Sequence, residues 1–217
     1  MEKTINYLAF GDSLTVGFGD PTGLGFVVLY QQWVAQLLHV PVTLQHAGTN
    51  GATTTELLNQ LETDANLQAK VRDADVITIT AGGNDLIQAA IPFFFENDSQ
   101  YLKTALQVYE ANYRKLVEVI DHLHQGSAKP YVMALIGLYN PLPQVPDSAY
   151  WVQRFNLILR KLEQPHIIHV QVYDAFIDKD DSYLADDYIH PNEQGYEAVA
   201  RQVERTVPVQ RLQDLII

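Results

Sequence analysis

The chain has 217 residues, with 14 Lys and Arg against 26 Asp and Glu, which gives a formal net charge of -12. An acidic chain is repelled by anionic polymers and surfaces, so neither nucleic acid nor anionic lipid is an expected partner. The chain contains no cysteine, which excludes disulfides, thiolate nucleophiles and cysteine zinc sites. We expect residues 1–217 to form a single domain.

The N-terminal stretch MEKTINYLAF has an apolar run that is too short for the core of a signal peptide. No segment reaches the roughly 20 apolar residues that a membrane-spanning helix needs. We therefore expect a cytoplasmic protein with no integral membrane segment.

Short runs rich in β-branched and aromatic residues alternate with segments of helical pattern along the chain. In chain order, the patterns predict a strand at 5–10, a helix at 26–39, a strand at 42–47, a helix at 54–60, strands at 76–81 and 131–136 flanking a helix at 101–125, a helix at 148–162, a strand at 167–173 and a helix at 193–207. Nearly continuous apolar character indicates strands buried on both faces. The fold class is therefore α/β, a three-layer α/β/α sandwich around a parallel sheet. In such sheets, the loops that leave the carboxyl ends of the strands build the functional site.

The loop after the first strand reads GDSLTVGFGD. It matches neither a Walker A motif nor the G-x-G-x-x-G fingerprint, so it does not predict a phosphate cradle. Thr15 stands where the second glycine of a G-x-S-x-G nucleophile elbow belongs. Two interpretations stay open from this loop alone: a turn in which Ser13 caps the next segment, or a serine presented to a substrate.

The loop before the last helix contains Asp187 and His190, three residues apart. At this spacing the carboxylate can orient the imidazole and stabilise its protonated form, although such a pair can also arise by chance. Pro191 restricts His190 to extended or turn geometry outside the helix that follows.

The two middle loops read GTNGATT and GGNDL. Gly51 could offer an unobstructed backbone N–H, and the Asn84 amide could donate to a developing oxyanion. Each loop alone could equally be a turn followed by a helix cap. What favours a functional reading is that all four stretches follow successive predicted strands.

Together, these stretches resemble the sequence blocks of the SGNH hydrolases, also called GDSL esterases and lipases. The blocks are Gly11-Asp12-Ser13-Leu14, Gly51, Gly82-Gly83-Asn84-Asp85 and Asp187-Tyr188-Ile189-His190, and the match runs from residue 8 to about residue 200. The chain departs from the family pattern at His46, where an Asn often stands.

The resemblance implies a flavodoxin-like sheet of five parallel strands. It implies Ser13 as the nucleophile, His190 as the base and Asp187 as the acid behind the histidine. It also implies an oxyanion hole made of the Ser13 N–H, the Gly51 N–H and the Asn84 side chain. Asp12 is expected to tie the loop down through hydrogen bonds.

The remaining predictions concern the substrate pocket and cofactors. The segment 87–95 is unusually apolar and either lines an acyl pocket, through Ile87 and Phe93, or packs beneath the long helix. Tyr139 and Asn140 follow the fourth strand and could line the same pocket. His122 and His124 cannot share a helix face, and no carboxylate cluster is evident beside His166 and His169, so no metal and no cofactor are expected.

The favoured function is a serine esterase that hydrolyses short- to medium-chain acyl esters or thioesters through an acyl-enzyme on Ser13, with a small-molecule ester and water as its partners. A carbohydrate deacetylase or a lysophospholipase remains open within the same class of enzyme. The alternative from another class is a non-catalytic carbohydrate- or lipid-binding module, which would not need Ser13, Asn84 and His190 together.

Overall fold

A computed structural model describes residues 3–126 and 129–216 of the chain. Its strands are β1 (Ile5–Gly11), β2 (Val42–Gly48), β3 (Val76–Thr80), β4 (Val132–Ile136) and β5 (Ile167–Val170). They form one parallel sheet in the order β2-β1-β3-β4-β5, the flavodoxin-like order. The predicted five-stranded parallel sheet is thus confirmed.

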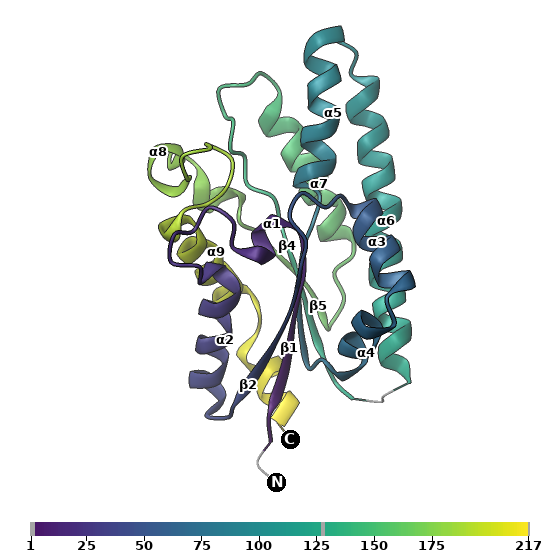
Figure 1. Cartoon of the computed structure of the whole chain (residues 1–217), viewed down its shortest axis with the longest axis vertical. Coiled ribbons are helices and arrows are strands. Elements are labelled where there is room, and N and C mark those ends of the chain that lie inside the picture. Colours follow the sequence, from purple (N-terminus) through teal and green to yellow (C-terminus); the bar gives the residue numbers. More distant parts are fainter. Residues whose placement is uncertain (1–2, 127–128, 217) are drawn as a thin grey trace.

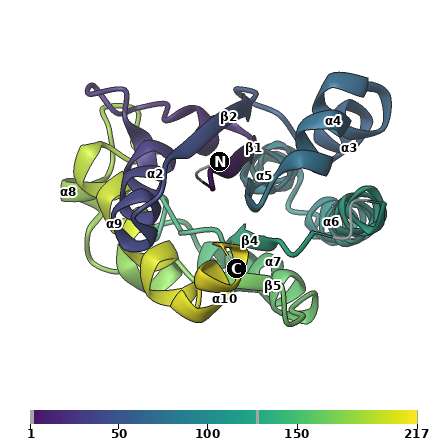
Figure 2. The ribbon, with the colours of Figure 1, turned by 90° about the horizontal axis from the view of Figure 1, so that it is seen from below.

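Helices cover both faces of this sheet (Figures 1 and 2). They are α1 (Ser13–Val16), α2 (Gly25–Leu38), α3 (Thr54–Thr63), α4 (Ala65–Asp73), α5 (Gly83–Glu96), α6 (Gln100–Gln125), α7 (Ser148–Lys161), α8 (Asp180–Tyr183), α9 (Glu193–Thr206) and α10 (Val209–Gln213), with 3-10 turns η1 (Tyr173–Phe176) and η2 (Asp214–Ile216). Helices α2, α9 and α10 pack on one face, and α3, α4, α6 and α7 pack on the other. None of the helices within residues 3–126 and 129–216 is both long and apolar enough to span a bilayer.

Two cores form because successive side chains of a strand point to opposite faces of the sheet. Along β1, Tyr7 and Ala9 join the core beneath α2 and α9, whereas Leu8 and Phe10 join the core beneath α3, α6 and α7. All four residues are buried. The continuous apolar run of β1 therefore reflects burial on both faces, as the sequence predicts for a parallel sheet.

The last strand is shorter than predicted and ends at Val170 rather than at residue 173. Strand β5 pairs only with β4, whose last residue, Ile136, lies opposite Val170, so the chain beyond has no partner in the sheet. The Gln171 side chain instead accepts a hydrogen bond from the Tyr173 N–H (3.0 Å), where η1 begins.

Five of the helices in the described residues lie where the sequence pattern predicts none; α4 and α5 are the longest of them, and the others are α1, α8 and α10. Helix α4 follows α3 directly because the Asp64 side chain accepts hydrogen bonds from the backbone N–H of Asn66 and Leu67 and starts a new helix. Helix α5 contains Pro92, a residue that usually breaks helices, which hides it in the sequence. Figure 1 shows α5 rising beyond the carboxyl edge of the sheet beside α6, next to the loops that build the site.

Candidate active site

The turn after β1 presents Ser13 at the carboxyl edge of the sheet. Gly11 has φ 148°, and a side chain there would come within 2.3 Å of the Thr80 carbonyl oxygen, so only glycine lets β1 and β3 approach this closely. Asp12 is buried and caps α1: its Oδ1 accepts hydrogen bonds from the Leu14 N–H (3.0 Å) and the Thr80 hydroxyl (2.7 Å). Asp12 therefore ties the turn down, as the sequence predicts.

Burial disfavours the charged form of Asp12 and raises the pKa of its carboxyl group, although its two hydrogen bonds oppose the rise. The hydrogen bonds that Asp12 accepts from the Leu14 N–H and the Thr80 hydroxyl support a structural part for it beside Ser13.

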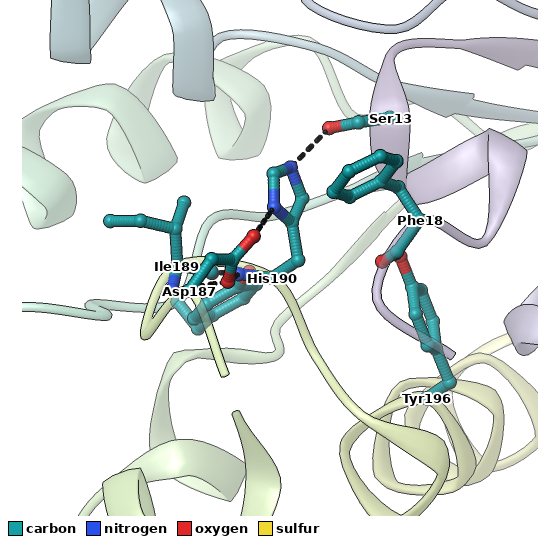
Figure 3. Close-up of polar contacts among 7 residues, drawn as sticks. Ser13, Phe18, Asp187, Ile189, His190 and Tyr196 are labelled. Carbon is teal, nitrogen blue, oxygen red and sulfur yellow. Dashed lines mark hydrogen bonds and ion pairs between the residues drawn. The ribbon is translucent and has the colours of Figure 1, made fainter. Parts of the chain in front are cut away.

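His190 approaches Ser13 from the opposite end of the chain. Its Nε2 lies 3.0 Å from Ser13 Oγ, and its Nδ1 lies 2.6 Å from Asp187 Oδ2 (Figure 3). The loop is closed by a hydrogen bond from the Ala185 N–H to the His190 carbonyl, and Asn192 caps α9 immediately afterwards. As predicted from Pro191, the His190 ring stays outside the helix.

The Asp187 carboxylate is held in its charged form. Partial burial alone would raise its pKa, but hydrogen bonds from the His190 ring and from the backbone N–H groups of His190 and Ile189 outweigh this effect and lower the pKa below the ordinary value. An ionised Asp187 fixes the His190 tautomer, because Nδ1 must carry the proton that it shares with the carboxylate. Nε2 is then free to accept a proton from Ser13.

An aromatic side chain that the sequence reading did not single out lies beside His190. The rings of Phe18 and His190 are 4.6 Å apart between centroids in an edge-on arrangement (Figure 3). The Phe18 N–H donates to the Ser13 carbonyl (3.1 Å), and the Phe18 carbonyl accepts from the Tyr196 hydroxyl (2.8 Å). Gly19 follows with φ 93°, and a side chain there would meet the Pro191 carbonyl at 2.7 Å. The aromatic residue between two glycines in GFG is the signal that could have identified Phe18.

The three donors predicted for the oxyanion hole come from three loops: Ser13 follows β1, Gly51 follows β2 and Asn84 follows β3. Within the described residues, the backbone N–H groups of Ser13 and Gly51 donate no hydrogen bond. The Asn84 side-chain amide donates one hydrogen bond to the Ala52 carbonyl (3.0 Å). The loops themselves are joined, because the buried Asp85 carboxylate accepts hydrogen bonds from the Thr54 N–H (2.9 Å) and hydroxyl (2.5 Å). Ser13 and Asn84 line the same cavity, whereas Gly51 lines a separate hollow together with Ala52, so the oxyanion hole stays a prediction.

A cavity of about 290 Å³ opens between Ser13, α5 and the loop after β4. Ser13, Asn84, Asp187 and His190 line it together, and its other walls are mainly apolar: Leu86, Ile87, Ile136, Leu138, Val152 and Ile189. Three larger hollows among the described residues, of about 850, 510 and 320 Å³, lie elsewhere and touch neither Ser13 nor His190.

The structure places only two of the four predicted substrate-binding residues on this cavity. Ile87 and Tyr139 line it, and the Tyr139 hydroxyl donates to the Ile189 carbonyl (2.5 Å). Asn140 lies outside it, bonded to Ser148 and to the Leu142 N–H, and Phe93 is also absent from its walls. The segment 87–95 belongs to α5 and leaves several large apolar side chains exposed, so it does not simply pack beneath α6.

Two further histidines, His46 and His166, have hydrogen-bond partners, whereas the buried His169 Nε2 has none among the described residues. His46 Nε2 donates to the Thr15 carbonyl (2.8 Å) and its Nδ1 accepts from the Gly48 N–H (3.4 Å), which fastens α1 to β2 at the position where the family pattern often has Asn. His166 Nε2 lies 3.0 Å from one carboxylate, that of Asp121, and this single neighbour does not make a carboxylate cluster. Among the described residues, no three His, Asp or Glu side chains gather in a way that could hold a metal ion.

Comparison with known proteins agrees with this geometry. The model of the GDSL-like lipase/acylhydrolase family matches residues 9–198. The chain belongs to this family. It is similar to the spore germination lipase LipC of Bacillus licheniformis, with 35% identity over 92% of this chain and 95% of the relative.

Solved structures of the same fold include the lipase Lip_vut3 from a goat rumen metagenome, with a TM-score of 0.88 and 33% identity over 93% of this chain and 96% of that one. An acetylxylan esterase mutant from Geobacillus stearothermophilus shares the fold at a TM-score of 0.69 and 21% identity, over 94% of this chain and 95% of that one. The family assignment makes this GDSL hydrolase a carboxylic ester hydrolase, and the three-layer SGNH fold is confirmed.

Proposed function

We propose that this GDSL hydrolase cleaves acyl esters through a covalent acyl-enzyme, with Ser13 as the nucleophile, His190 as the general base and Asp187 as its orienting acid. The observation that carries the proposal is the continuous hydrogen-bonded line from Ser13 Oγ through the His190 ring to Asp187 Oδ2 (3.0 and 2.6 Å). A nucleophile next to a base that a third group orients is the arrangement that activates a serine.

In the first half of the reaction, Ser13 Oγ attacks the ester carbonyl carbon while its proton passes to His190 Nε2. The carbonyl oxygen becomes an oxyanion, which the N–H groups of Ser13 and Gly51 and the Asn84 amide stabilise. His190 then gives the proton to the leaving alcohol as the C–O bond breaks, which leaves the acyl group on Ser13. Asp187 stabilises the imidazolium that exists between these two transfers.

In the second half, a water molecule takes the place of the alcohol. His190 accepts a proton from the water as its oxygen attacks the acyl carbonyl, and returns that proton to Ser13 Oγ as the acid leaves. Only the neutral imidazole can accept these protons, so activity should fall as the pH is lowered. The steps need no cofactor.

The apolar walls of the cavity support an acyl group as its occupant, and its modest volume supports short to medium chains. Thioesters have the same carbonyl geometry and belong to the proposed substrate class. We propose a small-molecule ester and water as the partners of the reaction and the cytoplasm as its location.

A panel of p-nitrophenyl esters, from acetate to palmitate, tests this function with and without EDTA. We expect hydrolysis of the short and medium esters, unchanged by EDTA, because every group in the mechanism comes from the chain itself. Absence of hydrolysis across the panel, or loss of activity on chelation with recovery on adding a divalent metal, would contradict the proposal.

A further inference from the structure

One face of α5 is apolar and exposed for most of its length. Ile87 lines the cavity and is itself 38% exposed, and Ile91 and Phe94 follow it with 56% and 69% of their surfaces exposed. The spacings of four and three residues place these side chains one above another on the same side of the helix. The face therefore starts inside the cavity and continues out of it along α5, which rises beyond the sheet (Figure 1).

The other side of α5 has a different character. Asp85, Gln88 and Pro92 line the hollow of about 850 Å³ that α5 shares with α3 and α6, together with hydroxyl and carboxylate side chains. No charged residue occurs from 86 to 95, whereas Glu96 at the end of the helix binds the Tyr101 hydroxyl (2.6 Å). Helix α5 thus turns a mixed side, with Asp85, Gln88, Ala89 and Pro92, toward α3 and α6, and its large exposed apolar side chains lie on the other side.

We propose that the apolar face of α5, formed by Ile87, Ile91 and Phe94, binds the distal carbons of the substrate acyl chain where they leave the cavity. This inference rests on the proposed function and adds to it the residues that set chain-length preference. Because a helix rises 1.5 Å per residue, the face extends about 10 Å beyond Ile87. An extended chain advances about 1.2 Å per bond, so roughly eight further carbons can lie along it.

The surroundings of this face favour an acyl chain over an anionic lipid surface. Glu96 and Asp98 lie at the far end of α5, and the chain as a whole carries a net charge of -12. Acidic residues at the tip repel anionic headgroups. Continuity with the cavity through Ile87 makes the substrate itself the best-placed occupant.

The test compares kcat/KM for p-nitrophenyl esters of 4 to 12 carbons, at concentrations where the esters are monomeric, in the wild type, Ile91→Ser and Phe94→Ser. In the wild type, kcat/KM should keep rising beyond six carbons by roughly two-fold per CH2, which is half of the free energy that full burial provides. Both variants should flatten this rise and leave hydrolysis of the four-carbon ester unchanged.

Phe93→Ser is the matched control. Phe93 precedes Phe94, lies about 100° around the helix from it, is separated from Ile87 and Ile91 by six and two residues, and is absent from the walls of the cavity. This variant loses the same side chain from the same turn, so it should keep the wild-type chain-length profile. Circular dichroism and thermal melting establish that all three variants fold.

The outcomes separate this inference from the function on which it rests. If the wild type hydrolyses no ester, the proposed function fails. If it hydrolyses the four-carbon ester but Ile91→Ser and Phe94→Ser keep its profile, the acyl-chain inference is overturned. A defect confined to aggregated substrate would assign the face to a lipid interface, and a change of oligomeric state would assign it to a second copy of the chain; either result overturns the inference.

Discussion

The two ends of α5 are built in opposite ways. At its beginning, Asn84 and Asp85 are bonded to Ala52 and Thr54, and Asp85 is buried. Towards its end, Ile91, Phe94 and Phe95 are exposed. Hydrogen bonds fix the end that would face a developing oxyanion, where small displacements are costly. The other end can change its side chains without disturbing that geometry.

This difference separates two kinds of effect. Substitutions among the fixed residues around Ser13 should lower kcat for every ester, because they act on steps that all esters share. Substitutions on the exposed face of α5 should change preference among esters.

Ser13→Ala should reduce hydrolysis of all esters by about three orders of magnitude or more, because the covalent route is lost and only binding and the oxyanion donors remain. The protein should stay folded, since among the described residues the Ser13 side chain is bonded only to His190 and takes no part in holding the turn. Steady-state kinetics with a thermal melt measure both. Residual activity above a tenth of the wild-type value would show that Ser13 is not the nucleophile.

Asn84→Ala should lower kcat by about 10² to 10³ with a smaller change in KM, because the amide is needed mainly when charge develops on the carbonyl oxygen. Asn140→Ala is the matched control, since this amide binds Ser148 and lies outside the cavity. It should leave kcat nearly unchanged. A rise in KM at constant kcat for Asn84→Ala would instead assign Asn84 to ground-state binding.

Phe18→Ala should lower kcat by about ten-fold with little change in KM, because His190 loses the ring that packs against it. Phe18→Tyr keeps the ring and should restore most of the wild-type rate. Kinetics of the pair decide whether Phe18 positions His190. If the tyrosine variant is as slow as the alanine variant, packing of the aromatic ring is not the cause.

Asp187→Asn should change how stability depends on pH. The pKa of Asp187 is lower in the folded chain than in the unfolded chain, so its carboxylate contributes stability above the unfolded value of about 3.9, and this contribution is lost as the pH falls through the folded value. The wild type should therefore exceed the variant in stability above pH 5, and the difference should shrink below pH 4. Urea unfolding at several pH values measures this difference in stability. A difference that grows as the pH falls would contradict a lowered pKa for Asp187.

The sequence predicts the five strands and the residues that meet at their carboxyl ends because both follow from local patterns. Apolar runs mark buried strands, and Ser13, Asn84 and His190 follow strands whose ends share one edge. The elements that the sequence does not predict depend on tertiary contacts. Helix α5 is not predicted because Gly82, Gly83 and Pro92 disfavour a helix locally, whereas in the fold its packing against α6 stabilises it.

The same reason explains the residues around the cavity. Ile87 and Phe93 look equivalent in an apolar run, but their directions around α5 separate them, and only Ile87 reaches the cavity. Phe18 is 172 residues from His190 in sequence, so no local pattern relates the two rings. A helix that is not predicted leaves the directions of its side chains unknown.

Whether Ser13 is the nucleophile can be decided by treating the protein with a fluorophosphonate, digesting it and locating the adduct by mass spectrometry. An activated serine attacks phosphorus, whereas ordinary serines do not, so the account predicts one adduct, on Ser13. His190→Ala should greatly slow its formation, because the base that removes the Ser13 proton is gone. An adduct on another serine, such as Ser148 or Ser182, or equal labelling of Ser13 without His190, would contradict the assignment of Ser13 as the nucleophile.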